Sequence, residues 1–265
     1  MTRQEPFFIV GCVRSGTTML RDILRADANL VCPEETHYYR WGEPFGTNQY
    51  MNTVTKNAVI RKHRSMDGIE DDVFTDLLRR ARSRKALLIR YMEAFKQKKR
   101  AADRRWFDKT PQNIYGLPLL MHDFPEASFI HIVRNPLNVS ASLLVGKVMA
   151  VSSVVAAANY WNEAVAIFNT LRPLIAERSF EIRYEDLTSR PVEEAGKLAD
   201  FLGISVAPLT TKLKSVHPER DQYHQMLTAA DVDIISDVCG TWAEHYGYDL
   251  SAATESSAAQ QETVS

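Results

Sequence analysis

Residues 7–20 read Phe7-Phe8-Ile9-Val10-Gly11-Cys12-Val13-Arg14-Ser15-Gly16-Thr17-Thr18-Met19-Leu20. The aromatic and β-branched residues at the start of this stretch predict a buried strand. Apolar residues then recur at helical spacing from Met19 to Leu24, which predicts a helix after the loop. Gly11 and Gly16 have the G-x-x-x-x-G spacing of a phosphate-binding loop, whose backbone N–H groups close on an anion at a helix N-terminus. The stretch therefore predicts a strand, an anion-binding loop and a helix, in that order.

The loop departs from the nucleoside-triphosphate form of this motif. That form has a lysine and then Ser or Thr after the second glycine, so that the lysine reaches the phosphates and the hydroxyl holds Mg²⁺. Here Thr17 occupies the lysine position, and the positive charge has moved to Arg14 inside the loop. Together with Ser15, Gly16 and Thr18, these residues offer a guanidinium, three hydroxyls and the loop amides to one compact anion. The composition of the loop suits a short anion without a chelated metal.

This stretch resembles the 5′-phosphosulfate loop of sulfotransferases that use 3′-phosphoadenosine-5′-phosphosulfate (PAPS), in the R-S-G-T-T form of tyrosylprotein-type and many bacterial members. The resemblance implies an α/β, P-loop-like three-layer fold, with a central mostly parallel sheet flanked by helices. It also implies PAPS as the donor, adenosine 3′,5′-bisphosphate (PAP) as the product, no metal, and a catalytic role for Arg14.

Length and composition indicate an ordinary globular protein. The chain has 265 residues, of which 45% are hydrophobic and 25% charged, and a formal net charge of −1, which argues against a nucleic-acid partner. Cys12, Cys32 and Cys239 are odd in number and far apart, so they indicate neither a disulfide framework nor a zinc site. No signal peptide and no apolar run of membrane-spanning length is evident, and we therefore expect a cytoplasmic protein without a membrane span.

The polarity of the chain changes along its length. Residues 39–105 are polar and basic, with two apolar stripes at helical spacing, and they predict a helical insertion or cap. Residues 251–265 contain Ala, Ser, Thr, Glu and Gln without an apolar anchor and predict a disordered tail. We therefore expect one sulfotransferase-like α/β domain over residues 1–250.

A second short strand, residues 29–32, leads into Pro33-Glu34-Glu35-Thr36-His37. Taken alone, two carboxylates here indicate a solvated loop near a helix N-cap. In an open α/β sheet, however, ligands bind beyond the carboxyl ends of the strands, where this turn and the Arg14 loop are both expected. The tyrosylprotein-type sulfotransferases carry a similar E-E-T, and the resemblance implies that Glu35 is the catalytic base. Cytosolic sulfotransferases use a histidine, so His37 is the alternative base.

A strand that ends at a proline is predicted for Trp106-Phe107-Asp108-Lys109-Thr110-Pro111, and it would deliver Lys109 to the same edge of the sheet. Spacing alone favours a lysine that pairs with Asp108 or points to solvent. The resemblance implies instead a catalytic Lys109 that contacts the bridging oxygen of the leaving group.

A further motif lies in residues 127–142, where a buried-type strand ends in Arg134 and a helix predicted from Pro136 carries Ser142 about two turns along. Each residue alone has an ordinary structural explanation. Strand-R-x-P-x-x-x-x-x-S is nevertheless the 3′-phosphate signature of sulfotransferases. The resemblance extends to Phe180–Leu187, a predicted late strand. The cofactor-binding residues that it implies are Arg14, Ser15, Gly16, Thr17, Thr18, Met19, Arg134, Ser142 and Tyr184.

One family segment is missing. The R-K-G-x-x-G-x-W stretch that completes the 3′-phosphate pocket of cytosolic sulfotransferases is not found, although Lys212, Lys214, His217 or Arg220 could substitute. The adenine contacts are not assigned either.

Two other functions remain open from the sequence: a P-loop-type kinase of small metabolites, and a non-catalytic nucleotide-binding protein. A kinase needs Mg²⁺ and normally a lysine where Thr17 stands. The acceptor of a sulfotransferase would be a hydroxyl on a small molecule, a carbohydrate, a lipid or a peptide. The sequence does not identify it, and it does not indicate the oligomeric state.

Overall fold

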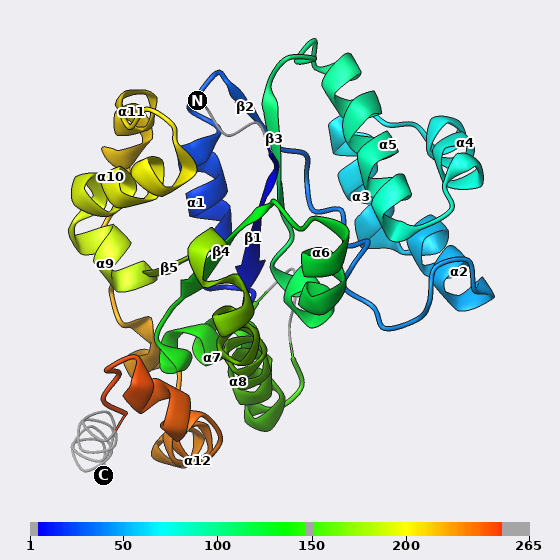
Figure 1. Ribbon diagram of the computed structural model, residues 1–265. Helices are drawn as coiled ribbons and strands as arrows, with labels where there is room; N and C mark the ends of the chain where they lie inside the picture. The colour runs from blue at the N-terminus through cyan, green and yellow to red at the C-terminus, as the bar shows by residue number, and fades with distance from the viewer. Residues whose placement is uncertain (1–4, 147–150, 251–265) are drawn as a thin grey trace.

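A computed structural model describes residues 5–146 and 151–250 of the chain (Figure 1). Within these residues, five strands form one sheet in the order β2-β3-β1-β4-β5, and every neighbouring pair is parallel. The strands are β1 (Phe7–Gly11), β2 (Leu30–Val31), β3 (Arg105–Lys109), β4 (Ser128–Val133) and β5 (Ser179–Arg183). Because the strands are parallel, their carboxyl ends all lie at one edge of the sheet, with β1 in the middle.

Helices connect the strands. The α-helices are α1 (Thr17–Leu24), α2 (Asn48–Lys56), α3 (Ala58–Asp67), α4 (Asp71–Arg80), α5 (Arg84–Lys98), α6 (Leu117–Asp123), α7 (Pro136–Leu144), α8 (Val154–Leu171), α9 (Tyr184–Ser189), α10 (Pro191–Leu202), α11 (Thr210–Leu213) and α12 (Ala229–His245). Short 3₁₀ helices are η1 (Pro111–Gly116), η2 (Arg172–Arg178), η3 (Ala207–Leu209) and η4 (Gln222–Gln225).

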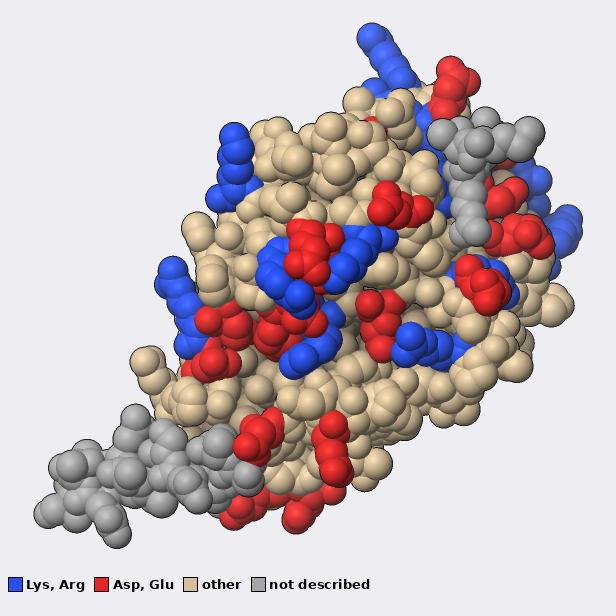
Figure 2. All heavy atoms as spheres, turned by 60° about the vertical axis from the view of Figure 1, so that its left-hand side comes forward, with Lys and Arg blue, Asp and Glu red and all other residues tan. Residues whose placement is uncertain are grey.

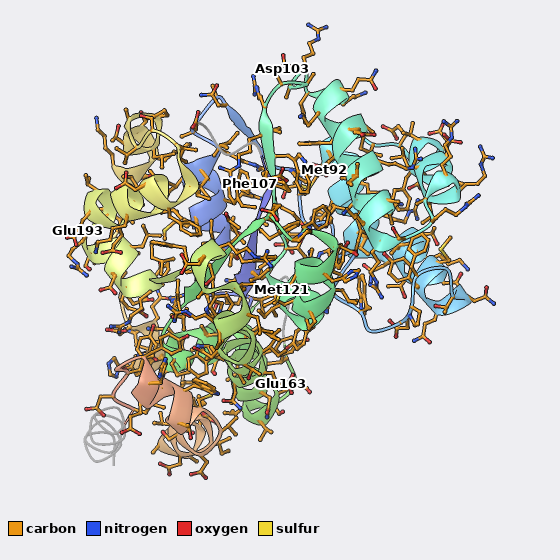
Figure 3. The ribbon with its side chains drawn as sticks, in the orientation of Figure 1. Met92, Asp103, Phe107, Met121, Glu163 and Glu193 are labelled. Carbon is orange, nitrogen blue, oxygen red and sulfur yellow. The ribbon has the colours of Figure 1, made fainter. Side chains whose placement is uncertain are left out.

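The alternation of side chains along β1 produces the three layers. Phe7 and Ile9 belong to a buried cluster with residues of α1, α10 and α11, whereas Phe8 and Val10 belong to a cluster with α5, α6, α7, α8 and α12. Both faces of the sheet are therefore buried, as a parallel sheet requires. Figure 3 shows Phe107 of β3 near the centre of the molecule, where its ring stacks on that of Phe7 at 4.6 Å.

The predicted helical insertion is present as α2–α5, between β2 and β3. In Figure 1 these helices lie on the opposite side of the molecule from α9–α11. Arg84 joins α5 to the chain that follows β2, because its guanidinium donates hydrogen bonds to the carbonyl oxygens of Tyr38 and Glu43. The insertion is thereby tied to the segment that carries Glu35.

The predicted fold class is confirmed, with one local correction. The late strand predicted for Phe180–Leu187 ends at Arg183, and Tyr184 begins helix α9. The reason is chemical: Glu185 and Asp186 stand in the first turn of α9, where carboxylates favour the positive end of a helix dipole. Residues 251–265, predicted to be a tail, lie outside the described residues.

The remaining composition-based predictions concern cysteines, charge and membrane spans. The three cysteines are buried and free. Figure 2, which brings the side of α9–α11 forward, shows acidic and basic side chains interspersed, and ion pairs such as Arg190–Asp186 and Lys197–Glu193 lie on these helices. Among the described helices, none has the length and apolar character that crossing a membrane requires.

Candidate active site

The loop after β1 has the geometry of an anion cradle. Arg14 and Gly16 both have positive φ, 69° and 92°, and Gly16 caps α1 without a side-chain hydrogen bond. The first N–H groups of α1 have no partner within the helix, so they are free to bind an anion at its positive end. A Cβ atom on Gly16 would lie 2.3 Å from Cδ2 of Tyr184, so the loop needs glycine for both conformation and space.

Glu35 and Lys109 form an ion pair beside this loop. The Lys109 ammonium lies 2.5 Å from Oε1 of Glu35 and 3.3 Å from the Thr18 hydroxyl. Lys109 is 2% exposed, whereas the side chain of Glu35 is 21% exposed, so the pair is buried on the lysine side and open to the cavity on the glutamate side. Burial raises the pKa of Glu35, but the charge and the hydrogen bond of the Lys109 ammonium oppose that effect, and the net shift holds the pKa below its usual range. Glu35 is consequently an ionised carboxylate at neutral pH and able to accept a proton.

Asp108 anchors the Glu35 turn and does not pair with Lys109, in contrast to one alternative left open by the sequence. Its carboxylate accepts hydrogen bonds from the hydroxyls of Thr36 and Thr110, each at 2.8 Å, and from the amide of Asn113 at 3.0 Å. The backbone N–H of Thr36 also donates to Thr110. Burial raises the pKa of Asp108 to about 6, although the two threonine hydroxyls oppose this shift. The network joins the turn after β2 to the end of β3.

The two adjacent glutamates have different environments. Glu34 is bound by the guanidinium groups of Arg21 and Arg25, at 2.6 and 3.2 Å, and serves the packing of α1. Glu35 faces the cavity described below. His37 also lines that cavity; its Nε2 lies 3.4 Å from Oε2 of Glu35, and burial lowers the pKa of His37 to about 3. His37 is therefore neutral at physiological pH.

The second motif lies directly beside the first. Nη1 of Arg134 donates to the carbonyl oxygen of Arg14 at 3.0 Å, and Nε of Arg14 donates to the hydroxyl of Ser142 at 2.8 Å. Nε of Arg134 also donates to Glu219 at 2.6 Å. The indole N–H of Trp161 holds the carbonyl oxygen of Arg134, which fixes the backbone at the start of α7. Two motifs that are 120 residues apart in sequence are thus in direct contact.

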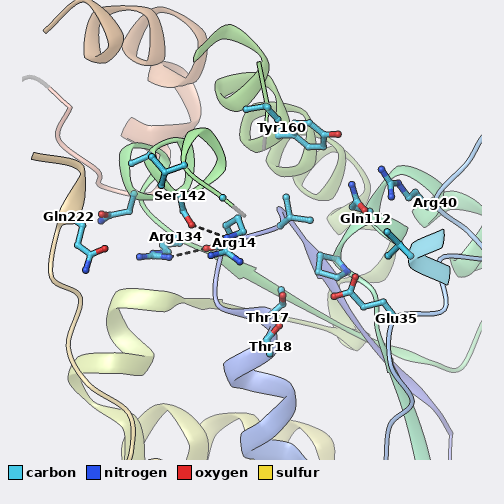
Figure 4. A pocket seen from close by; sticks show the side chains of 18 of the residues that line it. Arg14, Thr17, Thr18, Glu35, Arg40, Gln112, Arg134, Ser142, Tyr160 and Gln222 are labelled. Carbon is cyan, nitrogen blue, oxygen red and sulfur yellow. Dashed lines mark hydrogen bonds between the residues drawn. The ribbon is translucent and has the colours of Figure 1, made fainter. Parts of the chain in front are cut away.

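These groups surround one cavity of about 860 Å³, a size typical of small-molecule sites. In Figure 4, Arg134, Ser142 and Gln222 lie at one end, Glu35, Gln112 and Arg40 at the other, and Thr17 and Thr18 between them at the start of α1. Of the residues predicted from the sequence, the lining includes Arg14, Thr17, Thr18, Glu35, His37, Arg134 and Ser142.

The other predicted residues lie behind this lining. Lys109 reaches the site through Glu35 and Thr18, and Ser15 is buried beneath the loop. Met19 packs against the core on the α1 side. Tyr184 supports the loop, with its ring against Gly16 and the Arg134 guanidinium 4.5 Å above it.

Sequence reasoning missed several lining residues, namely Arg40, Val59, His63, Gln112, Asn138, Tyr160, Gln222 and Met226. Asn138 lies inside the Arg134–Ser142 motif, at a position that the motif leaves unspecified. The others lie in helices or loops without a motif of their own, so no sequence signal identified them. Conversely, Lys212, Lys214, His217 and Arg220, the suggested substitutes for the missing basic segment, are exposed and do not line this cavity.

Glu35, His37 and His63 also satisfy the distance requirement for a metal site, since their ligand atoms lie within 4.8 Å of one another. The electrostatics of the site oppose a cation. Glu35 is already bonded to the Lys109 ammonium, and the positive charge of Arg40 acts on His37 in the same direction as that of Lys109. We therefore assign these residues no metal.

Comparison with known proteins identifies the family. The family model described as "Sulfotransferase family" matches residues 6–208. The chain belongs to the sulfotransferase family. It is therefore a sulfotransferase, in a family that typically uses PAPS, and the alternative of a kinase is not supported.

Individual relatives of this sulfotransferase are distant. The omega-hydroxy-beta-dihydromenaquinone-9 sulfotransferase Stf3 of Mycobacterium bovis is 22% identical over 307 residues, covering 92% of this chain and 75% of the relative. The sulfotransferase domain of the Synechococcus PCC 7002 olefin synthase superposes with a TM-score of 0.60 and 21% identity, over 90% of this chain and 94% of that one. Mouse sulfotransferase SULT7A1, complexed with PAP, gives a TM-score of 0.53 and 15% identity, over 92% and 90% of the two chains. These structures share the fold.

Proposed function

We propose that this enzyme transfers the sulfuryl group of PAPS to a hydroxyl of an acceptor that has an apolar body. One observation carries the proposal: the Arg14 loop and the Arg134–Ser142 pair border a single cavity, and the ionised Glu35 lines it as well. PAPS is anionic at both its 5′ and 3′ positions, and two adjacent cationic groups suit a ligand of that kind.

At the 5′ end, the loop amides of Ser15, Gly16 and Met19, with the side chains of Thr17 and Thr18, would hold the phosphosulfate at the N-terminus of α1. Arg14 would neutralise charge without exchanging protons, because its guanidinium stays protonated. At the 3′ end, Arg134 and Ser142 would bind the phosphate. Tyr184 would contribute by supporting Gly16 and Arg134.

Sulfuryl transfer is an in-line displacement that depends on positioning and electrostatics. The acceptor oxygen forms a bond to sulfur as the bond from sulfur to the bridging phosphate oxygen breaks, and PAP leaves. Glu35 takes the proton of the acceptor hydroxyl. Lys109 has three N–H donors, so it can bond Glu35 and Thr18 and still offer one to the departing oxygen.

The cavity lining supports an acceptor with an apolar body. Val59, Val145 and Met226 are among the exposed large hydrophobic side chains of the described chain, and all three line this cavity. Exposed apolar side chains in the lining of a cavity are typical of a ligand-binding surface. The mycobacterial relative, named for a hydroxylated menaquinone derivative, is in keeping with a lipid or other hydrophobic alcohol.

Glu35→Gln tests the assignment of the base. The amide retains the shape of the side chain but accepts no proton at this step, so turnover should fall by about 10²–10⁴-fold. Affinity for PAP, measured by calorimetry, should stay close to that of the wild type, because Glu35 is assigned to the acceptor side. The acceptor for the assay comes from pools screened with labelled PAPS, with the product identified by mass.

His37→Gln is the matched control, because His37 lines the same cavity two residues away. It should retain most of the activity. If His37→Gln loses turnover while Glu35→Gln keeps it, histidine is the base. Failure of the wild-type protein to bind PAP, together with tight binding of ATP–Mg²⁺, would overturn the proposed function as a whole.

A further inference from the structure

The guanidinium of Arg134, which is proposed to bind the 3′-phosphate, already forms an ion pair with the carboxylate of Glu219. Oε2 of Glu219 lies 2.6 Å from Nε of Arg134, and the two side chains are only 13% and 17% exposed. A carboxylate bonded to an arginine in a partly dry site offers the same chemistry as a phosphate oxygen there, a charge-assisted N–H···O⁻ bond. Glu219 therefore stands where an anionic ligand of Arg134 would bind.

The segment that carries Glu219 is anchored on both sides. Before it, Val216 packs against the cluster of α1, α10 and α11; after it, Tyr223 is buried against the opposite cluster. Between them, Asp221 has a positive φ of 44° and accepts a hydrogen bond from Asn138 of α7 at 2.9 Å. A non-glycine residue in this conformation is held there by its surroundings. The fold thus presents Glu219 to Arg134 from a short strap, residues 217–222.

The strap leads into the cavity lining. Gln222, its last residue, lines the cavity, and so do Tyr223 and Met226, which follow the strap, together with Arg134 and Asn138. Figure 4 shows Gln222 at the Arg134 end, away from Glu35. Exchange of Glu219 for a ligand would consequently act at the 3′ end of the donor.

We infer that Glu219 is an internal substitute for the 3′-phosphate, which occupies the 3′-phosphate position of the donor site until a ligand with a 3′-phosphate displaces it. This inference rests on the proposed function. The Arg134–Glu219 contact defines a closed state, and PAP or PAPS binds the open one. The apparent dissociation constant then equals the intrinsic value divided by the open fraction. The contact lowers the affinity for the donor. In the enzyme without donor, it also provides the half-buried Arg134 with a partner of opposite charge.

Glu219→Gln tests this by removing the competing charge with almost no change of shape. We expect the Kd for PAP, measured by calorimetry, to fall by about three- to tenfold. That change corresponds to a closed state that outweighs the open state by about the same ratio in the wild type. Adenosine 5′-monophosphate has the 5′-phosphate and lacks the 3′-phosphate, so its Kd should not change. Glu219→Ala should behave in the same way and serves as the second variant if the first does not fold.

Glu93→Gln is the control for net charge. Glu93 is exposed on α5 and lies outside the cavity lining, so its loss should leave both constants unchanged. A gain of equal size for PAP and adenosine 5′-monophosphate in Glu219→Gln would indicate a general charge effect and overturn the inference. So would unchanged or weaker PAP binding, which would make Glu219 a positioning residue for Arg134. If the folded wild type binds no PAP, the proposed function fails, and the inference with it.

Discussion

At the scale of single residues, Gly16 determines whether the 5′ loop can form. Its φ of 92° is rare for residues with a side chain, and an added Cβ would overlap the ring of Tyr184 at 2.3 Å. Gly16→Ala should therefore destabilise the fold by about 1–3 kcal/mol. It should also weaken PAP binding by at least about tenfold, because displaced loop amides no longer converge on the 5′ anion. Thermal unfolding and calorimetry measure the two effects.

Gly240→Ala is the matched control. Gly240 lies within α12, where an added Cβ meets no atom within 4 Å, so alanine should raise the stability by roughly 0.5–1 kcal/mol and leave PAP binding unaltered. Equal behaviour of the two variants would mean that the conformation of the Gly16 loop does not matter for the anion site.

At the scale of elements, the strands and the two motifs are predictable because each depends on local sequence. The apolar run of β1 and its glycine loop lie within fourteen consecutive residues, and Pro136 marks the start of α7 in the same local way. The predicted end of the last strand, Leu187, lies four residues beyond the end of β5 at Arg183. The alternation of apolar and polar residues continues past Arg183, whereas Glu185 and Asp186 favour the start of a helix. Local patterns of strand and helix overlap there, and tertiary packing decides between them.

The partners within the site depend on contacts that local patterns do not record. Lys109 had two alternatives by spacing, and its pairing with Glu35 follows from the turn after β2 being tied to Asp108. Glu219 lies 85 residues beyond Arg134, in a segment without a motif. The sequence therefore allowed prediction of which residues could bind anions, and the assembled sheet was needed to see which of them are already paired.

Thr36→Val tests the connection between the Glu35 turn and β3. The change removes one buried hydroxyl that donates to Asp108 and keeps the shape of the side chain. We expect a loss of about 1–3 kcal/mol in the free energy of unfolding. We also expect lower kcat with a near-normal Kd for PAP, since Glu35 shifts while the anion loops stay in place.

Thr75→Val provides the comparison, because Thr75 is exposed on α4 and its hydroxyl donates to the carbonyl oxygen of Asp71, in the preceding turn of the same helix. It should change neither kcat nor PAP binding. A Thr36→Val enzyme with wild-type kcat would show that the hydrogen bond to Asp108 is not what positions Glu35.

At the scale of the whole molecule, the parallel sheet brings the ends of β1 and β4 together, and so places Arg14 beside Arg134. If one donor molecule contacts both arginines, with its 3′-phosphate at Arg134, then Arg134 should determine the preference for PAP over adenosine 5′-monophosphate. We expect Arg134→Ala in the Glu219→Gln background, which leaves no orphan carboxylate, to weaken PAP binding by roughly tenfold or more. Binding of adenosine 5′-monophosphate should hardly change, so the ratio of the two Kd values should approach one.

The same arginine also bonds the Arg14 carbonyl oxygen, and a purely structural role would give a different result. Loss of that bond alone would loosen the 5′ loop, and both ligands would weaken in parallel. Calorimetry with the two nucleotides separates these outcomes, and Arg79→Ala, an exposed change on α4, controls for the loss of one positive charge. A parallel loss would mean that the two cationic groups serve one end of the donor; a selective loss requires that each binds its own phosphate.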